Sequence, residues 1–365
     1  MIWFSLVFAS ELPDVGPYDR YRVGIPHYPG AVASSSLSSV LLQPPPSGIP
    51  YQLEEPPVPD VFVAQEAIEA MQIAPWHEAG LTGAGVKLAI FDLQWYGAEL
   101  HTDELGEFHT QDCEAHSSCE IPMDTLRPRY SFEEGSHGVA CAEVVRDIAP
   151  GVELYLVRVN GPTTLQAAAE WAVRNKIDIV SMSLSFFNDS FYDGSGDVNG
   201  AINQLRLGGV LMVNSAGNYA TEHWDGDFFD PDQDGDMDFP WGSSYIPMNF
   251  SAGNVTVYVS WDQFRGCGDT DFDIYLYDEN GNLRGRSEDR QSATAEFCSP
   301  VERLSGYVEN NDWNYLKIVR HGGDPVVHLA IYARNGEIYH PTPGGMADPA
   351  SNVSAFTVGA VRAAN

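Results

Sequence analysis

The sequence predicts an α/β fold, a doubly wound parallel sheet, with an antiparallel β-sandwich inserted into it. Patterns typical of helices and of buried strands alternate between residues 62 and 221, as they do in βαβ units. From about residue 222 to 341, strands with a period of two replace them, joined by Asn-Gly and Gly-rich turns. The segment ASNVSAFTVGAV then returns to the buried-strand pattern, so residues 342–365 are predicted to rejoin the first sheet.

The elements of the α/β part follow from hydrophobic periodicity and from the signals at their ends. A Thr cap signal begins the helix at Thr163, and glycines open the strand that starts at Thr82. The patterns assign helices to 61–80, 163–176 and 198–209, with a further helix that follows His137, and strands to 82–93, 152–159, 177–187 and 210–218.

The remaining segments differ from the α/β part in composition. Residues 1–61 are rich in Pro, Ser and Gly and are interpreted as a linker or an extended arm. In residues 222–341 the alternating pattern assigns strands to 254–264, 271–287, 313–321 and 326–339. Exposed loops tolerate such insertions, so this part is predicted to interrupt the α/β domain.

The charge of the chain is strongly negative, with a formal net charge of −32. Lysine occurs only at positions 87, 176 and 317. Such a field repels nucleic acid and anionic membranes, which excludes a nucleic-acid partner. No apolar run is long enough to span a bilayer, and the N-terminal MIWFSLVFAS lacks the basic region of a secretory signal.

Five cysteines permit two disulfides and one free thiol. Cys113 and Cys119 lie close together in a polar loop, and Cys267 and Cys298 flank strands of the predicted sandwich, so a bridge is expected there as well. Cys141 falls in an apolar helical run and is interpreted as a buried thiol. This pattern favours an oxidising compartment, outside the cell or in its envelope, and the alternative is five unpaired cysteines.

Polar residues follow the predicted parallel strands where the carboxyl ends of those strands meet. Asp92 ends one strand, Ser183–Ser185 end another, and Asn218 ends a third, while His137 begins a helix in the segment EEGSHGVACAEVVRDIAP. A hydroxyl or thiol nucleophile needs a base, and the base needs an acid that orients it. Asp92 is a candidate to orient His137, and Asn218 is a candidate donor to an oxyanion. The structural alternative is that these residues only cap strands, turns and a helix.

Cys141 lies one helical turn from His137, a spacing that also suggests a Cys–His pair. Because the position belongs to the apolar face of the helix, we interpret the thiol as part of the packing.

Five blocks of the chain, taken in order, resemble the subtilisin-like serine peptidases: HEAGLTGAGVKLAIFDLQ, SHGVACAEVVRDIAPGVELYLVRV, IDIVSMSLS, GVLMVNSAGN and ASNVSAFTVGAV. The resemblance covers roughly residues 62–221 and 342–365. It implies a sheet of subtilisin type and a serine endopeptidase that acts on polypeptides through an acyl-enzyme and requires no cofactor for the chemistry. It also implies that Asp92 orients the base His137 and that Asn218 donates to the oxyanion. Ser183, Leu184 and Ser185 would pair with an extended peptide.

Three departures from the family pattern stand out. The aspartate is followed by Leu93, Gln94 and Trp95 instead of a small residue and glycine, and Ala140 replaces the second histidine of the usual HGTH block. The Gly-Thr-Ser block that carries the family's nucleophile is not found in the 365 residues. Ser243 and Ser244 lie in the insert and lack the helix that should follow. We therefore expect the nucleophile beyond Asn365 and no activity of the chain as given. The alternative is a pseudoprotease that binds peptides or proteins.

The insert contains an acidic loop, DPDQDGDMDF, in which Asp230, Asp232, Asp234 and Asp238 surround Gly235. Alternating carboxylates followed by a glycine match the first part of a calcium loop, although Trp241 stands where the closing glutamate would be. The sequence leaves open a structural calcium ion and a solvated acidic turn.

Overall fold

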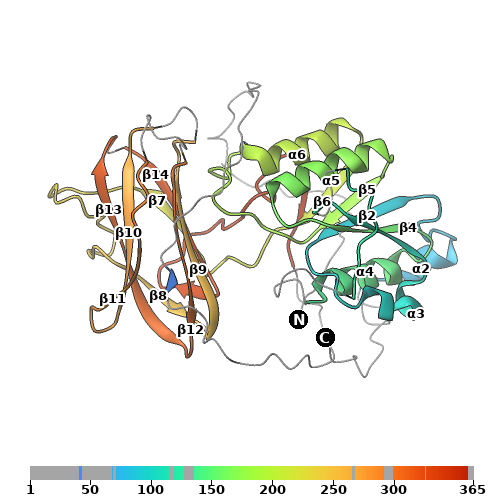
Figure 1. Ribbon diagram of the computed structural model, residues 1–365, viewed down its shortest axis with the longest axis horizontal. Coiled ribbons are helices and arrows are strands. Elements are labelled where there is room, and N and C mark those ends of the chain that lie inside the picture. Colours follow the sequence, from blue (N-terminus) through green and yellow to red (C-terminus); the bar gives the residue numbers. More distant parts are fainter. Residues whose placement is uncertain are drawn as a thin grey trace.

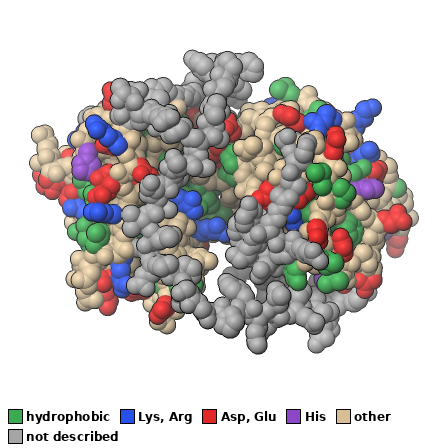
Figure 2. All heavy atoms as spheres, viewed as in Figure 1, with side chains coloured by type: hydrophobic (Ala, Val, Ile, Leu, Met, Phe, Trp, Pro, Cys, Tyr) green, Lys and Arg blue, Asp and Glu red, His purple; other side chains and the backbone are tan. Residues whose placement is uncertain are grey.

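Figure 1 shows the computed structural model, in which a sheet covered by helices lies beside two further sheets. The structure describes residues 41–42, 68, 71–114, 118–126, 135–264, 268–291, 299–324 and 326–360. Figure 2 shows Asp and Glu side chains scattered over both parts of the face in view, not gathered in one patch. In the described residues, no helix is long and apolar enough to cross a membrane.

Six parallel strands form the first sheet, in the order β16-β6-β5-β2-β4-β3. An α/β fold with a parallel sheet is therefore confirmed. The edge strand β16 pairs with β6, so the segment near the end of the chain returns to the first sheet as predicted. The strands are β2 (Lys87–Asp92), β3 (Phe108–Asp112), β4 (Glu153–Arg158), β5 (Ile179–Met182), β6 (Leu211–Ser215) and β16 (Phe356–Val358).

Helices cover both faces of this sheet (Figure 1). Successive side chains of a strand point to opposite faces, so Leu88 and Ile90 of β2 pack with α4, whereas Ala89 and Phe91 pack with α5 and α6. Both sets are buried, which explains why β2 has an uninterrupted apolar pattern. The helices are α2 (Ala74–Glu78), the 3₁₀ helix η1 (Ala98–Leu100), α3 (Thr102–Leu105), α4 (His137–Ile148), α5 (Pro162–Arg174) and α6 (Gly196–Leu207).

The winding of the sheet reverses at β2. From β2 the chain passes to β3 and β4 on one side and then crosses to β5 and β6 on the other. In open α/β sheets, ligands bind in the crevice beyond the carboxyl ends of the strands at such a reversal. Asp92 is the last residue of β2, so it lies at this point.

Two five-stranded sheets have the orders β1-β12-β9-β14-β7 and β11-β10-β13-β8-β15, and all their strands except β1 (Leu41–Leu42) lie between β6 and β16 in the chain. All their pairings are antiparallel except that of β1 with β12. Both sheets contribute to one apolar core, for example Val257 and Ile331 from the first and Ile274 and Leu316 from the second. The strands are β7 (His223–Asp227), β8 (Ile246–Phe250), β9 (Gly253–Trp261), β10 (Asp271–Asp278), β11 (Leu283–Ser287), β12 (Val301–Val308), β13 (Asp312–Gly322), β14 (His328–Arg334) and β15 (Gly336–Ile338).

The segment after β5 joins the parallel sheet to the antiparallel strands. The ring of Phe187 stacks on that of Tyr258 in β9, with 4.6 Å between the ring centroids. Oγ of the buried Ser190 donates to Oδ2 of the buried Asp348, at 2.6 Å. The segment that follows β5 therefore contacts both β9, through Phe187, and the segment that precedes β16, through Ser190.

Several sequence predictions fall wholly or partly outside the described residues. Of the predicted arm 1–61, the structure describes only β1 (Leu41–Leu42), a strand parallel to β12. The expected bridge between Cys267 and Cys298 lies outside the described residues.

The other three cysteines are described by the structure. Cys113 and Cys119 form a disulfide, and Cys141 is a buried free thiol.

Candidate active site

Asp92 is fixed by the backbone that follows β2. Its Oδ1 accepts hydrogen bonds from the N–H groups of Leu93, at 2.8 Å, and Gln94, at 2.9 Å. The indole N–H of the fully buried Trp95 donates to the backbone carbonyl of Asp92 at 3.0 Å. These contacts orient the carboxylate and leave Oδ2 free for another partner.

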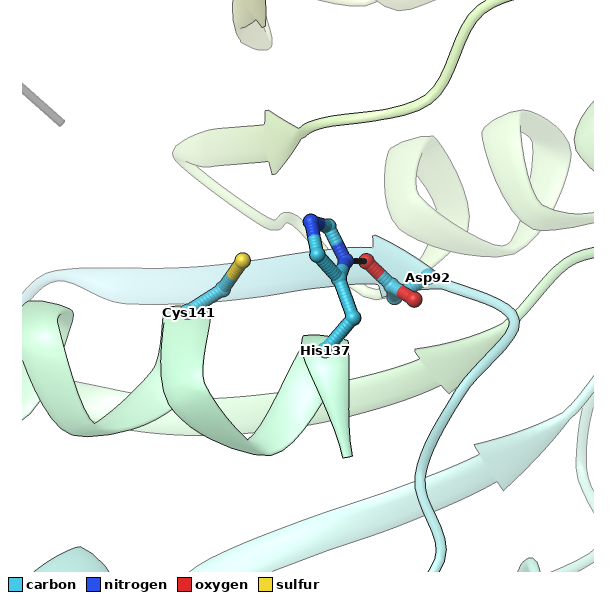
Figure 3. A group of neighbouring side chains, drawn as sticks. All are labelled: Asp92, His137 and Cys141. Atoms are coloured by element: carbon cyan, nitrogen blue, oxygen red, sulfur yellow. Dashed lines mark hydrogen bonds and ion pairs between the residues drawn. The ribbon is translucent and has the colours of Figure 1, made fainter. Parts of the chain in front are cut away.

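That partner is His137, the first residue of α4. Its Nδ1 lies 2.6 Å from Oδ2 of Asp92, a hydrogen bond in which the imidazole donates to the carboxylate (Figure 3). The proximity of the two side chains agrees with the sequence prediction. The Asp92 side chain is 1% exposed and that of His137 is 24% exposed, so the imidazole can be reached while the carboxylate cannot. Among the described residues, Nε2 of His137 has no hydrogen-bond partner.

The hydrogen bond with Asp92 raises the pKa of His137 above its ordinary value of 6.5. Burial opposes this shift, and the negative charge of Asp92 adds to it. The carboxylate therefore favours the imidazolium, the form that the base reaches after it takes a proton.

Gly138 permits the close approach of α4 to β2, a role that sequence reasoning missed. Its N–H donates to the carbonyl of Gln94 at 2.9 Å. A Cβ at this position would lie 2.9 Å from Cβ of Asp92, 2.9 Å from the same carbonyl oxygen and 3.0 Å from the ring of Trp95. A side chain here would push the start of the helix away from Asp92. The only sequence feature that could have indicated this role is the glycine that directly follows His137 in SHGVAC.

Cys141 rises from α4 beside His137 (Figure 3), and a ligand atom from each of Asp92, His137 and Cys141 lies within 4.8 Å of the others. Burial, together with the charge of Asp92, raises the pKa of the Cys141 thiol far above the neutral range. Because the thiolate is the nucleophilic form of cysteine, this thiol is unsuited to attack. The geometry supports the interpretation of Cys141 as packing and not as part of a Cys–His pair.

The segment Ser183–Ser185 continues from β5, the strand next to β2. The side chain of Ser183 lies near the Cys141 thiol, and that of Ser185 lies near Tyr219 in the loop after β6. The segment thus runs from α4 to the loop that carries Asn218. Its backbone forms no hydrogen bond to any residue that the structure describes, and it is free to pair with an added strand.

Asn218 is exposed on the loop after β6, two strands from Asp92 at the same carboxyl edge. The structure therefore brings Asp92 and His137 into contact and places Ser183–Ser185 and Asn218 along the same edge. Ser243 and Ser244 lie elsewhere, between β7 and β8, where Ser244 Oγ donates to Oδ1 of Asp238 at 3.1 Å.

A sequence model of the subtilase family matches residues 83–288, more than half of the chain. The chain belongs to the subtilase family. The matched region includes Asp92, His137, Ser183–Ser185 and Asn218. As a subtilase, the chain tolerates Leu93 and Gln94 after the aspartate because their backbone N–H groups, not their side chains, hold the carboxylate.

The related subtilases share moderate identity over part of their length. The "Minor extracellular protease Epr" of Bacillus subtilis (strain 168) is 28% identical over 166 residues, which is 41% of this chain and 23% of that protein. "Subtilisin BL" of Lederbergia lenta is also 28% identical over 166 residues, 41% of this chain and 54% of that protein. A "Thermostable alkaline protease" of Halalkalibacterium halodurans is 27% identical over 172 residues, 40% of this chain and 42% of that protein. The matches span about a quarter to a half of these relatives.

Proposed function

We propose that the chain carries the general base, its orienting acid, the oxyanion donor and the peptide-binding edge of a serine endopeptidase of the subtilisin type. His137 is the base, Asp92 orients it, and Asn218 donates to the oxyanion. The observation that carries this proposal is the 2.6 Å contact between His137 Nδ1 and Asp92 Oδ2 at the reversal of the sheet. Membership of the subtilase family supports it.

The proposed mechanism uses the two nitrogens of His137 separately. Nδ1–H donates to Asp92, which fixes the tautomer and leaves the lone pair of Nε2 to accept the proton of a serine hydroxyl. The serine oxygen then forms a bond to the scissile carbonyl carbon, and the carbonyl oxygen becomes an oxyanion. Nε2–H returns the proton to the leaving amine when the acyl-enzyme forms. The side-chain amide of Asn218 would donate to the oxyanion.

We place the nucleophilic serine in the chain that follows Asn365 in a longer protein. Ser243 and Ser244 are part of the loop between β7 and β8 and offer no alternative. By this proposal, the 365-residue chain alone hydrolyses no peptide bond at an enzymatic rate. Related triads without one member retain about 10³–10⁴ over the uncatalysed reaction, which ordinary assays would miss.

Polypeptides are the proposed substrates. The unpaired backbone of Ser183–Ser185 supports this, since an extended peptide can add to it as a further strand and present alternate side chains to the site. The same feature favours the second candidate function, a pseudoprotease that binds peptides without cleaving them.

We also propose a domain organisation and a location. Residues 62–221 and 342–365 would form the peptidase domain, residues 222–341 an inserted β-sandwich domain, and residues 1–61 an arm. The single apolar core shared by the two antiparallel sheets supports the sandwich. The Cys113–Cys119 disulfide and the extracellular relative Epr support a location outside the cell or in its envelope.

The test is proteolysis of an unfolded protein such as casein by the chain extended through the expected Gly-Thr-Ser block. We expect the extended protein to cleave casein and His137→Ala to abolish cleavage, because the serine loses its base. His109→Ala is the matched control, since His109 is exposed on the edge strand β3, and it should remain active. Cleavage by the 365-residue chain alone would contradict the proposal. A downstream sequence without a serine block would favour the binding protein instead.

A further inference from the structure

The loop between β7 and β8 gathers three carboxylates. One oxygen each of Asp230, Asp232 and Asp234 lies within 4.8 Å of the other two. The fourth residue of the sequence prediction, Asp238, is outside this group, and its Oδ1 accepts a hydrogen bond from Ser244 Oγ at 3.1 Å. The structure therefore reduces the side-chain ligand set to three residues.

The loop is held in place by the second antiparallel sheet. The carbonyl of Gly235 accepts the N–H of Arg320 in β13 at 2.8 Å, and the N–H of Met237 donates to the carbonyl of Ile318 at 2.9 Å. Met237 is buried in the core of the antiparallel part. Gly235 has a φ of 91°, a conformation that L side chains rarely adopt, and this sharp turn brings the carboxylates together. The cluster is therefore formed before any ligand binds.

Asp230 has an unsatisfied oxygen. Its side chain is 2% exposed, and its Oδ2 accepts the N–H of Gly235 at 3.2 Å and lies 3.7 Å from Arg320. Its Oδ1 is buried with no hydrogen-bond partner among the described residues. Burying a charged oxygen without a partner costs free energy, so such an atom calls for a cation.

The cluster carries an excess negative charge that a divalent cation would neutralise. Asp230, Asp232 and Asp234 carry −3, and the Arg320 guanidinium beside Asp230 carries +1, so −2 remains. The neighbouring Asp236 does not change this sum, because it pairs with Lys317 at 2.5 Å. Like charges this close repel one another unless a cation lies between them.

We propose that this loop binds one calcium ion through Asp230, Asp232 and Asp234. The ligands are hard carboxylate oxygens at alternate positions followed by glycine, as in the first half of a calcium loop. Water molecules and backbone carbonyls complete the six to eight oxygen ligands that calcium takes. Because the loop is tied to β13, the bound ion stabilises the antiparallel part of the protein.

The experiment is calorimetric titration of the 365-residue chain with calcium chloride in about 150 mM salt, which screens diffuse attraction to the acidic surface. We expect one ion per chain and a higher temperature of unfolding with calcium than with chelator. Asp232 is exposed, so Asp232→Asn should fold and still weaken binding at least about tenfold, since even outer-shell losses cost about 10–100-fold in metal affinity.

Asp236→Asn is the matched control. It removes the same charge from the same loop, but its side chain faces Lys317, so the calcium affinity should stay within about threefold. Three results would each overturn the proposal: no binding at millimolar calcium, equal losses in Asp232→Asn and Asp236→Asn, or magnesium binding as tightly as calcium. The last two would mean diffuse attraction to an acidic surface. None of these outcomes depends on peptidase activity.

Discussion

Asp92→Asn should lower kcat of the protein extended past Asn365 by about 10⁴ while the protein stays folded. The carboxylate that accepts Nδ1–H of His137 would be replaced by an amide that can donate to Nδ1, so the imidazole would present the wrong tautomer to the serine. The measurement is kcat across pH with a peptide substrate.

The pH profile should change in a defined direction. In the wild type the base works only when neutral, and Asp92 raises the pKa of His137, so the acid limb should lie above pH 6.5. The variant loses the hydrogen bond and the charge that raise this pKa but keeps the burial that lowers it. Its residual activity should therefore persist to lower pH.

The control for this variant is Asp178, which precedes β5 and contacts the opposite end of β2. Asp178→Asn alters a carboxylate whose Oδ2 accepts the N–H of Lys87 at 2.8 Å, at the amino end of β2. It should leave kcat within a few-fold of the wild type. If Asp92→Asn retained activity within tenfold of the wild type, Asp92 would not be the orienting acid.

Gly138→Ala should lower kcat/KM by about 10²-fold, the cost of misplacing catalytic groups by about 1 Å. The new Cβ would come within 2.9 Å of Cβ of Asp92 and of the backbone oxygen of Gln94, neither of which is the end of a flexible side chain. The start of α4, and with it His137, must move away from β2. The measurement is steady-state kinetics together with thermal unfolding.

Gly200→Ala is the matched control, in α6, where an added Cβ meets nothing within 4 Å. Alanine is favoured over glycine in a helix by up to about 1 kcal/mol, so this variant should be fully active and no less stable. Wild-type activity of Gly138→Ala would show that the contact between α4 and β2 has more freedom than the structure indicates.

The sequence predicted the parallel sheet well because its signals are local. Short apolar or alternating runs gave β2, β4, β5 and β6, and the pattern is strong enough that β16 could be assigned across the whole insert. The edge strand β3, with the mostly polar sequence FHTQD, was not predicted. The contact between Asp92 and His137, 45 positions apart, followed from parallel strands ending at one edge and from the order of the family blocks.

Features that depend on contacts between distant segments could not be predicted. Patterning gave the insert's strands β9, β10, β11, β13, β14 and β15 but missed β7, β8 and β12. It gave neither the order of the strands in two sheets nor the pairing of Leu41–Leu42 with β12. The need for glycine at 138 arises only when α4 meets the loop after β2. The spacing that suggested Asp230 as a ligand also suggested Asp238, whose side chain hydrogen-bonds Ser244 instead.

The role of His137 as the base is tested most directly by covalent labelling of the natural full-length protein with a fluorophosphonate, which reacts with serines activated by a base. We expect one labelled serine, located after Asn365 by peptide mass spectrometry. We also expect His137→Ala to eliminate the labelling and His109→Ala to retain it. A label on Ser243 or Ser244, no labelled serine, or labelling that persists in His137→Ala would contradict the assignment of His137 as the base of a subtilase.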